Sequence, residues 1–186
     1  MAVGSLVPMR PYSLVLQAIA EIEPLRRAGL TLTFIGAGPS EVRLKTQVRS
    51  LKLGDTVRFL SVQPRSTTLE LMRNGHLLIF PSLRDSGGSS VAEAMSMGLP
   101  VLAFDLAGPG AMLATGGGFL IKARSPRRLV AEIKNWLLRL LEHPELLKAC
   151  SREGREAARR LFDWPQRICR IETLYRSAMR NRTKGS

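Results

Sequence analysis

Two acidic side chains, Asp85 and Glu93, flank a glycine- and serine-rich turn in the stretch SLRDSGGSSVAEAMSMGLPV, residues 82–101. If a helix begins near Ser89, Asp85 lies in the loop before it and Glu93 lies in its second turn, roughly 10 Å further along the axis. The first amides of a helix lack partners within the helix, so they favour an anion, above all a phosphate. The spacing therefore suits a ligand with hydroxyls at both ends and a diphosphate in the middle, which is the shape of a nucleotide-sugar.

The same spacing has a simpler interpretation, which stays open at this point. Asp85 would then only cap the helix, and Glu93 would be a solvated helix residue.

Other kinds of site find little support among the residues. The turn GAGPS has Glu41 where a dinucleotide fingerprint needs its third glycine, and a Walker loop is absent. Cys150 and Cys169 have no C-x-x-C spacing and no nearby histidine, so neither a metal site nor a disulfide framework is indicated. His76 and His143 fall at a strand start and a helix end, which disfavours a Ser-His-Asp triad. We expect no metal and no cofactor.

Strand and helix patterns alternate along residues 1–124, where short turns separate them. Such alternation predicts a parallel sheet covered by helices on both faces, that is, a doubly wound α/β fold. After a short apolar start at MAVGSL, we expect strands over 30–36, 55–62, 76–82, 99–105 and 118–121, and helices over 12–29, 40–53, 65–75 and 89–98.

Only helices are expected from residue 125 onward. Helix-start prolines at 126, 144 and 165 divide this part into three segments, 125–143, 144–162 and 164–182. We therefore expect a Rossmann-like nucleotide-sugar-binding core over 1–124, C-terminal helices packed on it over 125–182, and a disordered tail over 183–186.

Charge is unevenly distributed along the 186 residues. Residues 122–186 hold 17 Lys and Arg against 7 Asp and Glu, and residues 1–121 hold 11 against 8, so the tail carries +10 of the net +13. A basic tail can meet nucleic acid, an anionic membrane or a polyanionic substrate, or it can be a solvated surface. The chain has no apolar run that could span a bilayer and no signal-peptide order, so we expect a cytoplasmic protein, with a peripheral place at the inner face of the membrane as an option.

Together, these motifs resemble the C-terminal, donor-binding half of GT-B glycosyltransferases in glycosyltransferase family 4, the group-1 retaining enzymes. The family hallmark is an acid, seven residues and a glutamate followed by EAM and GxPV, and here it stands as Asp85, Glu93 and EAMSMGLPV. Similarities extend over nearly the whole chain, in VGSLVPMRPYSLVLQAIAEI, LTFIGAGP, LGDTVRFLSV and LFDWPQRICRIETLY. The resemblance implies one Rossmann-like half of a GT-B fold.

What the resemblance implies for function is sugar transfer from a nucleotide-sugar to a glycan or lipid-linked acceptor, with retention at the anomeric carbon and without a metal. Asp85 and Arg10 match catalytic positions, and Glu93 matches the glutamate that holds the ribose. The residues expected at the donor sugar and diphosphate are Asp85, Ser86, Gly87, Gly88, Ser89, Ser90 and Arg10. The residues expected to border the base are Gly36, Gly38, Pro39 and Arg58.

Three departures from the family pattern limit this transfer of roles. The family's arginine falls at Ser5 and its lysine at Arg10, so one of two cationic phosphate contacts is lost. Asp85 replaces the more frequent glutamate and shortens the reach by one methylene. In the family an N-terminal domain supplies the acceptor site, and we expect it to be absent here. The chain is then expected to be a separated domain, a truncated gene product or one subunit of a split enzyme, which by itself binds donor weakly and transfers little.

A function from another class also stays open. The chain could be a nonenzymatic basic module with the same fold that binds nucleic acid or an anionic membrane. Aromatic residues make up only 5% of the chain, which counts against recognition of single-stranded nucleic acid. A nucleotide-sugar epimerase of the GT-B type shares the fold but is not expected to carry the EAM and GLPV arrangement.

Overall fold

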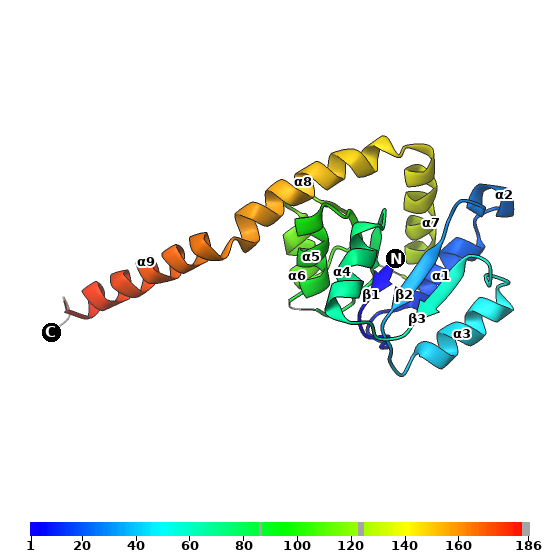
Figure 1. The fold of residues 1–186 in the computed structure, drawn as a ribbon, viewed down its shortest axis with the longest axis horizontal. Helices are drawn as coiled ribbons and strands as arrows, with labels where there is room; N and C mark the ends of the chain where they lie inside the picture. The colour runs from blue at the N-terminus through cyan, green and yellow to red at the C-terminus, as the bar shows by residue number, and fades with distance from the viewer. Residues whose placement is uncertain (86, 123–124, 184–186) are drawn as a thin grey trace.

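The computed structural model describes residues 1–85, 87–122 and 125–183. Strands and helices alternate over the first part of the chain and helices alone follow, as expected (Figure 1). The strands are β1 (Ala2–Val3), β2 (Leu32–Ile35), β3 (Val57–Leu60), β4 (Leu78–Phe80), β5 (Val101–Phe104) and β6 (Gly118–Ile121). The helices are α1 (Tyr12–Ala20), α2 (Pro24–Arg27), α3 (Glu41–Ser50), α4 (Arg65–Arg73), α5 (Ser89–Met97), α6 (Ala107–Leu113), α7 (Pro126–Glu142), α8 (Glu145–Phe162) and α9 (Trp164–Thr183).

The strands form two parallel sheets, β1-β2-β3 and β4-β5-β6. Backbone hydrogen bonds join them, since Met1 N donates to Leu77 O at 2.7 Å and Ile79 N donates to Met1 O at 2.8 Å. β1 therefore lies beside β4, and the strands follow the order 3-2-1-4-5-6 across both sheets. This order confirms the doubly wound fold, and its direction reverses between β1 and β4. Ligands bind in such folds at this switch point, beyond the carboxyl ends of the strands.

Apolar side chains cover both faces of the strands. On one face, Phe34 of β2 pairs in register with Phe59 of β3, and the two rings stack at 4.8 Å between centroids. Tyr12 of α1 meets Phe34 edge-on at 5.1 Å and is completely buried. On the other face, Met95 of α5 and Ala157 of α8 are completely buried in a second cluster. The two clusters form the apolar core on either side of the strands.

One expected helix is divided in the structure. The pattern over 12–29 predicted a single helix, but α1 ends at Ala20 and α2 begins at Pro24. Proline has no amide hydrogen to continue the ladder of α1, and it stands instead in the first turn of α2. The continuous helix was therefore a wrong prediction, although both segments lie within the expected range.

The three C-terminal helices differ in how they meet the body. α7 packs on α1, and α8 packs on α5. Gly154 of α8 also approaches Gly117, the residue before β6. α9 projects from the body, and its side chains from Trp164 to Arg180 are exposed wherever they are described (Figure 1). The division at residue 124 stays a prediction, and of the expected tail, residues 184–186 lie outside the described part. None of the helices in the described part of the chain combines the length and the apolar character that a membrane span requires.

Candidate functional site

Arg10 and Asp85 form an ion pair across the switch point. Arg10 lies in the loop after β1 and Asp85 in the loop after β4, and the Arg10 Nη2 donates to Asp85 Oδ2 at 3.0 Å. Each side chain keeps 18% of its surface exposed, so the pair is partly shielded and open to a ligand. The topology therefore brings together the two residues that sequence resemblance placed at catalytic positions.

The Arg10 side chain is held by its surroundings as well as by its charge. Its guanidinium lies over the Phe80 ring, with Cζ 4.8 Å from the ring centroid. Below it is Gly4, whose φ of +116° is rare for any other residue. A Cβ atom at Gly4 would stand 2.5 Å from Arg10 Nη1, so the absence of a side chain there makes room for the guanidinium.

The second carboxylate oxygen of Asp85 closes the turn before α5. Oδ1 accepts hydrogen bonds from the amides of Gly87, at 3.1 Å, and Gly88, at 2.8 Å. Partial burial acts to raise the pKa of Asp85, but the Gly88 and Gly87 amides and the Arg10 guanidinium outweigh it, so this pKa lies below its ordinary value. Asp85 is therefore held as a carboxylate with both oxygens engaged.

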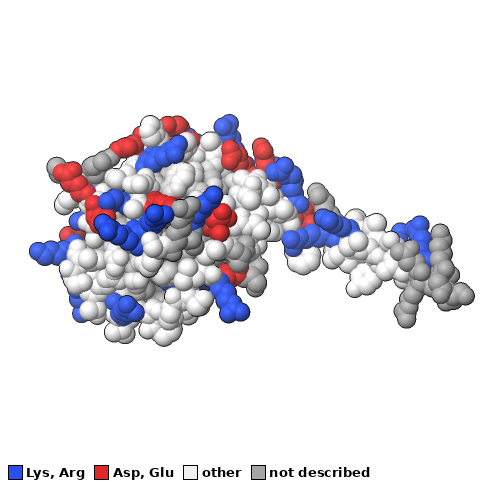
Figure 2. All heavy atoms as spheres, turned by 180° about the vertical axis from the view of Figure 1, so that it is seen from behind, with Lys and Arg blue, Asp and Glu red and all other residues white. Residues whose placement is uncertain are grey.

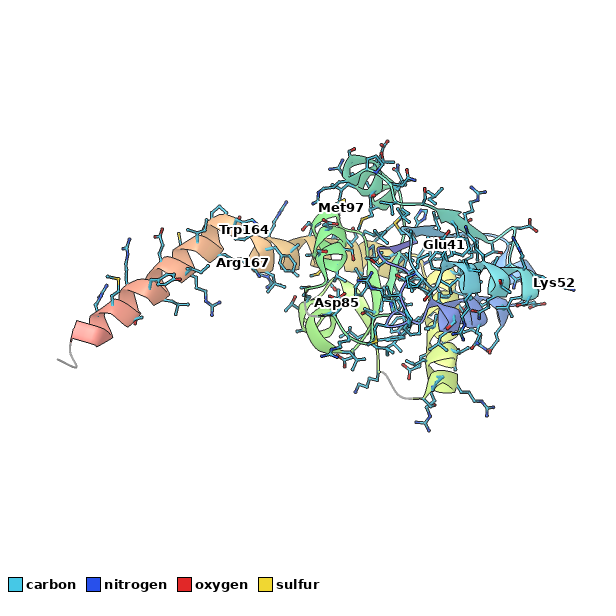
Figure 3. The ribbon with its side chains drawn as sticks, turned by 90° about the horizontal axis from the view of Figure 1, so that it is seen from below. Glu41, Lys52, Asp85, Met97, Trp164 and Arg167 are labelled. Atoms are coloured by element: carbon cyan, nitrogen blue, oxygen red, sulfur yellow. The ribbon has the colours of Figure 1, made fainter. Side chains whose placement is uncertain are left out.

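This arrangement changes how the glycine- and serine-rich turn can receive an anion. The amides of Gly87 and Gly88 already donate to Asp85, whereas the amides of Ser89 and Ser90 have no hydrogen-bond acceptor among the described residues. Asp85 lies at the amino end of α5 and Met97 at its other end (Figure 3). The amides open to a ligand are thus those of Ser89 and Ser90, at the start of α5. Ser86, also expected at the diphosphate, lies outside the described residues.

Glu93 is the acid of α5, and it does not stand alone in solvent. Its Oε1 pairs with Arg65 Nη1 at 2.7 Å, and its side chain keeps 25% exposure. Arg65 is the first residue of α4, the helix that follows β3. The sequence did not identify Arg65, because nothing in its local pattern indicates that the amino end of α4 lies beside the second turn of α5.

The residues expected near the base lie in and beside the loop after β2. This loop packs tightly on the loop that leads to Arg10: Leu6 N donates to Ala37 O and Ser40 N donates to Leu6 O, both at 2.9 Å. A side chain at Gly36 or Gly38 would collide with the backbone of that neighbouring loop, which explains both glycines.

Pro39 and Arg58 complete the expected base-binding set. Both side chains are exposed, and Arg58 is the second residue of β3, so it precedes the carboxyl end of its strand. Among the described residues, Arg58 forms no hydrogen bond or ion pair with Asp85 or Glu93. Its role at the base stays a prediction.

One cavity lies apart from this site. An apolar cavity of about 510 Å³ opens beside the amino ends of the strands, and residues such as Leu30, Leu77 and Leu140 line it. No group of three or more potential metal ligands occurs among the residues that the structure describes.

Comparison with known structures supports the fold. The chain is similar to WaaG, a glycosyltransferase involved in lipopolysaccharide biosynthesis, with a TM-score of 0.76 and 23% identity over 91% of this chain and 46% of the other. It is similarly close to Anabaena HepE in complex with UDP-glucose, with a TM-score of 0.75 and 22% identity over 95% and 48%. These likenesses place the fold as the Rossmann-like half of a GT-B architecture.

Sequence relatives agree with the structural likeness. The D-inositol 3-phosphate glycosyltransferase of Kineococcus radiotolerans is 30% identical over 97% of this chain and 44% of its own length. The 2-deoxystreptamine glucosyltransferase of Streptomyces kanamyceticus is 30% identical over 83% and 39%. The chain thus spans less than half the length of these relatives. Residues 1–157 match the family described as glycosyl transferases group 1, and the chain belongs to that family.

Proposed function

We propose that this chain is the donor-binding part of a retaining glycosyltransferase of family 4, which transfers a sugar from a nucleoside-diphosphate sugar to a glycan or lipid-linked acceptor. The observation that carries the proposal is the Arg10–Asp85 ion pair at the switch point, which lies at the amino end of α5. Structures similar in fold contain UDP, as in pneumococcal GtfA, or UDP-glucose, as in HepE. In the proposed class of reaction, UDP-glucose is a donor and UDP is a product.

The site residues have distinct roles in this proposal. The ion pair uses one of the five N–H donors of Arg10, so others can donate to the donor's diphosphate. As the bond from the sugar to the diphosphate breaks, negative charge grows on the leaving oxygen, and Arg10 and the Ser89 and Ser90 amides stabilise it. Asp85 accepts a sugar hydroxyl, and Glu93 accepts from the ribose.

Acceptor binding falls to a part of the enzyme outside this chain. The proposed partner is an N-terminal domain or a separate subunit, since the chain covers less than half of its relatives. We propose that the chain alone binds donor and transfers little.

Calorimetry with UDP, GDP, ADP and their sugars tests the proposal. We expect one of these ligands to bind, and we expect Glu93→Ala to weaken its binding. The matched control is Glu21→Ala, because Glu21 also pairs with a cation, Lys134 at 2.9 Å, but lies at the far end of α1. Absence of binding, or equal binding by wild type and Glu93→Ala, would contradict the proposal.

We propose a second contact for α9, with an anionic membrane surface near a lipid-linked acceptor. Trp164, Ile168, Ile171, Tyr175 and Met179 recur every three or four residues along α9, and each is at least 47% exposed. Figure 2 shows basic residues beside uncharged surface along this projecting helix. An apolar stripe with basic neighbours is typical of helices that lie in a membrane interface.

Liposome pelleting tests the membrane contact. The chain is expected to pellet with anionic vesicles and much less with neutral ones, and a chain ending at Asp163 is expected to stay in solution. If that shortened chain pellets as well, α9 is not the contact. The nonenzymatic alternative predicts oligonucleotide or membrane binding that Glu93→Ala leaves unchanged and that falls steeply with salt.

A further inference from the structure

Arg65 forms an ion pair with Glu93, the acid that we assign to the ribose. Its Nη1 lies 2.7 Å from Glu93 Oε1, while 75% of the Arg65 side chain stays exposed. The two residues come from different helices, since Arg65 begins α4 and Glu93 is in the second turn of α5. The contact therefore links the loop after β3 to the proposed donor site.

Helix stability does not explain a cation at this place. The amino end of a helix carries partial positive charge, so an arginine in the first turn is unfavourable there, whereas an acid is favourable. α4 has no acid in its first turn, whereas α3 has Glu41 there, paired with Lys45 one turn later at 2.6 Å. An ion pair with so exposed an arginine also contributes little to folding. What the contact does change is the freedom of the Glu93 side chain to adopt different rotamers.

A glutamate on a helix surface has several rotamers of similar energy. The guanidinium holds Oε1 of Glu93 in one place, and Oε2 has no hydrogen-bond or ion-pair partner among the described residues. An ionised carboxylate with one oxygen fixed and the other open is prepared to accept from the hydroxyls of a ribose. Fixing the rotamer before binding reduces the entropy lost when the ligand arrives.

We propose that Arg65 is a positioning residue that holds Glu93 ready for the ribose hydroxyls of the donor. The inference rests on the proposed function, and it adds a residue on α4 to a site otherwise built from α5 and the loops after β1, β2 and β4. It implies that Arg65 increases the preference of the protein for a ribose over a sugar that lacks the 2′ and 3′ hydroxyls.

The test compares two ligands, the nucleoside diphosphate among UDP, GDP and ADP that binds wild type best and its 2′,3′-dideoxy form. Arg65→Ala is expected to weaken binding of the ribose form about fivefold or more and to change binding of the dideoxy form less than about twofold. Arg65→Lys is expected to restore part of the difference, because one Nζ can replace the single Nη1 contact. In the Glu93→Ala background, Arg65→Ala is expected to have no further effect.

Lys134→Ala is the matched control, since it removes the cation of the Glu21 pair away from the site. An equal loss for both ligands would overturn the inference and assign Arg65 to the phosphates or the base. A gain in affinity, or no change in either, would overturn it as well. If wild type binds none of the nucleotides, the proposed function itself fails; if Glu93→Ala weakens binding and Arg65→Ala does not, only the role of Arg65 fails.

Discussion

Arg10 and Asp85 are 75 residues apart in the chain, and their side chains meet at 3.0 Å. The contact follows from the strand order, because β1 and β4 are neighbours and the loops after them leave the same edge of the sheets. Arg10 is also held by its stacking on Phe80. Asp85 is also held by the hydrogen bonds from the Gly87 and Gly88 amides. Contacts within the chain therefore suffice to hold the pair in place.

Two replacements of Asp85 distinguish its contact with the Gly87 and Gly88 amides from its ion pair with Arg10. Asp85→Ala removes the acceptor for the Gly87 and Gly88 amides and leaves Arg10 without its partner, so we expect a loss of about 1–2 kcal/mol in the free energy of unfolding. Asp85→Asn keeps one oxygen for the amides and is expected to lose less. Urea unfolding of the two variants measures the difference, and an equal loss in both would show that the amide contacts do not matter.

Acid should remove the contribution of Asp85 to stability. Its pKa is lower in the folded protein than in the unfolded chain, so this contribution is complete above about pH 4, the ordinary value, and is lost as the pH falls through the folded value. The difference in unfolding free energy between wild type and Asp85→Asn should then be largest near pH 7 and shrink below pH 4. A difference that stays constant or grows on acidification would contradict this sign.

Gly4→Ala tests the space beneath Arg10. The added Cβ would meet Arg10 Nη1 and would require φ of +116°, so we expect a loss of stability of about 1–3 kcal/mol. Nucleotide affinity should fall as well, because the guanidinium must leave its place beside Asp85. Gly54→Ala is the control, since its Cβ would find nothing within 4 Å. Wild-type affinity in Gly4→Ala would show that the placement of Arg10 does not matter for binding.

Removal of α9 should leave the folded body intact. The family match ends at residue 157, and the described side chains from Trp164 to Arg180 are exposed. We expect a chain ending at Asp163 to keep its melting temperature within about 2 °C, whereas Leu137→Ala, in the core contact of α7, should lower it by about 8 °C or more. A large loss on truncation would mean that α9 stabilises the body.

Much of this architecture could be predicted from local patterns. Glycine turns and prolines mark most element boundaries, and the helix from Ser89 to Met97 begins and ends where the sequence indicates. The break at Pro24 was missed because the apolar pattern continues across it.

The site was predictable in its residues and less so in its contacts. Asp85 and Arg10 were identified as separate matches to a family, and only the strand order shows that they pair. The Gly87 and Gly88 amides were expected to face a diphosphate, yet in the structure they face Asp85. Arg65 was missed because its partner lies on another helix, and contacts of that kind depend on packing that no local pattern records.

A crystal structure of the chain with its nucleoside-diphosphate sugar tests the central claim most directly. We expect the diphosphate beside Arg10 and the Ser89 and Ser90 amides, the sugar against Asp85, and the ribose on Glu93. A ligand bound elsewhere, for example in the apolar cavity near Leu30 and Leu140 at the opposite edge of the sheets, would contradict it.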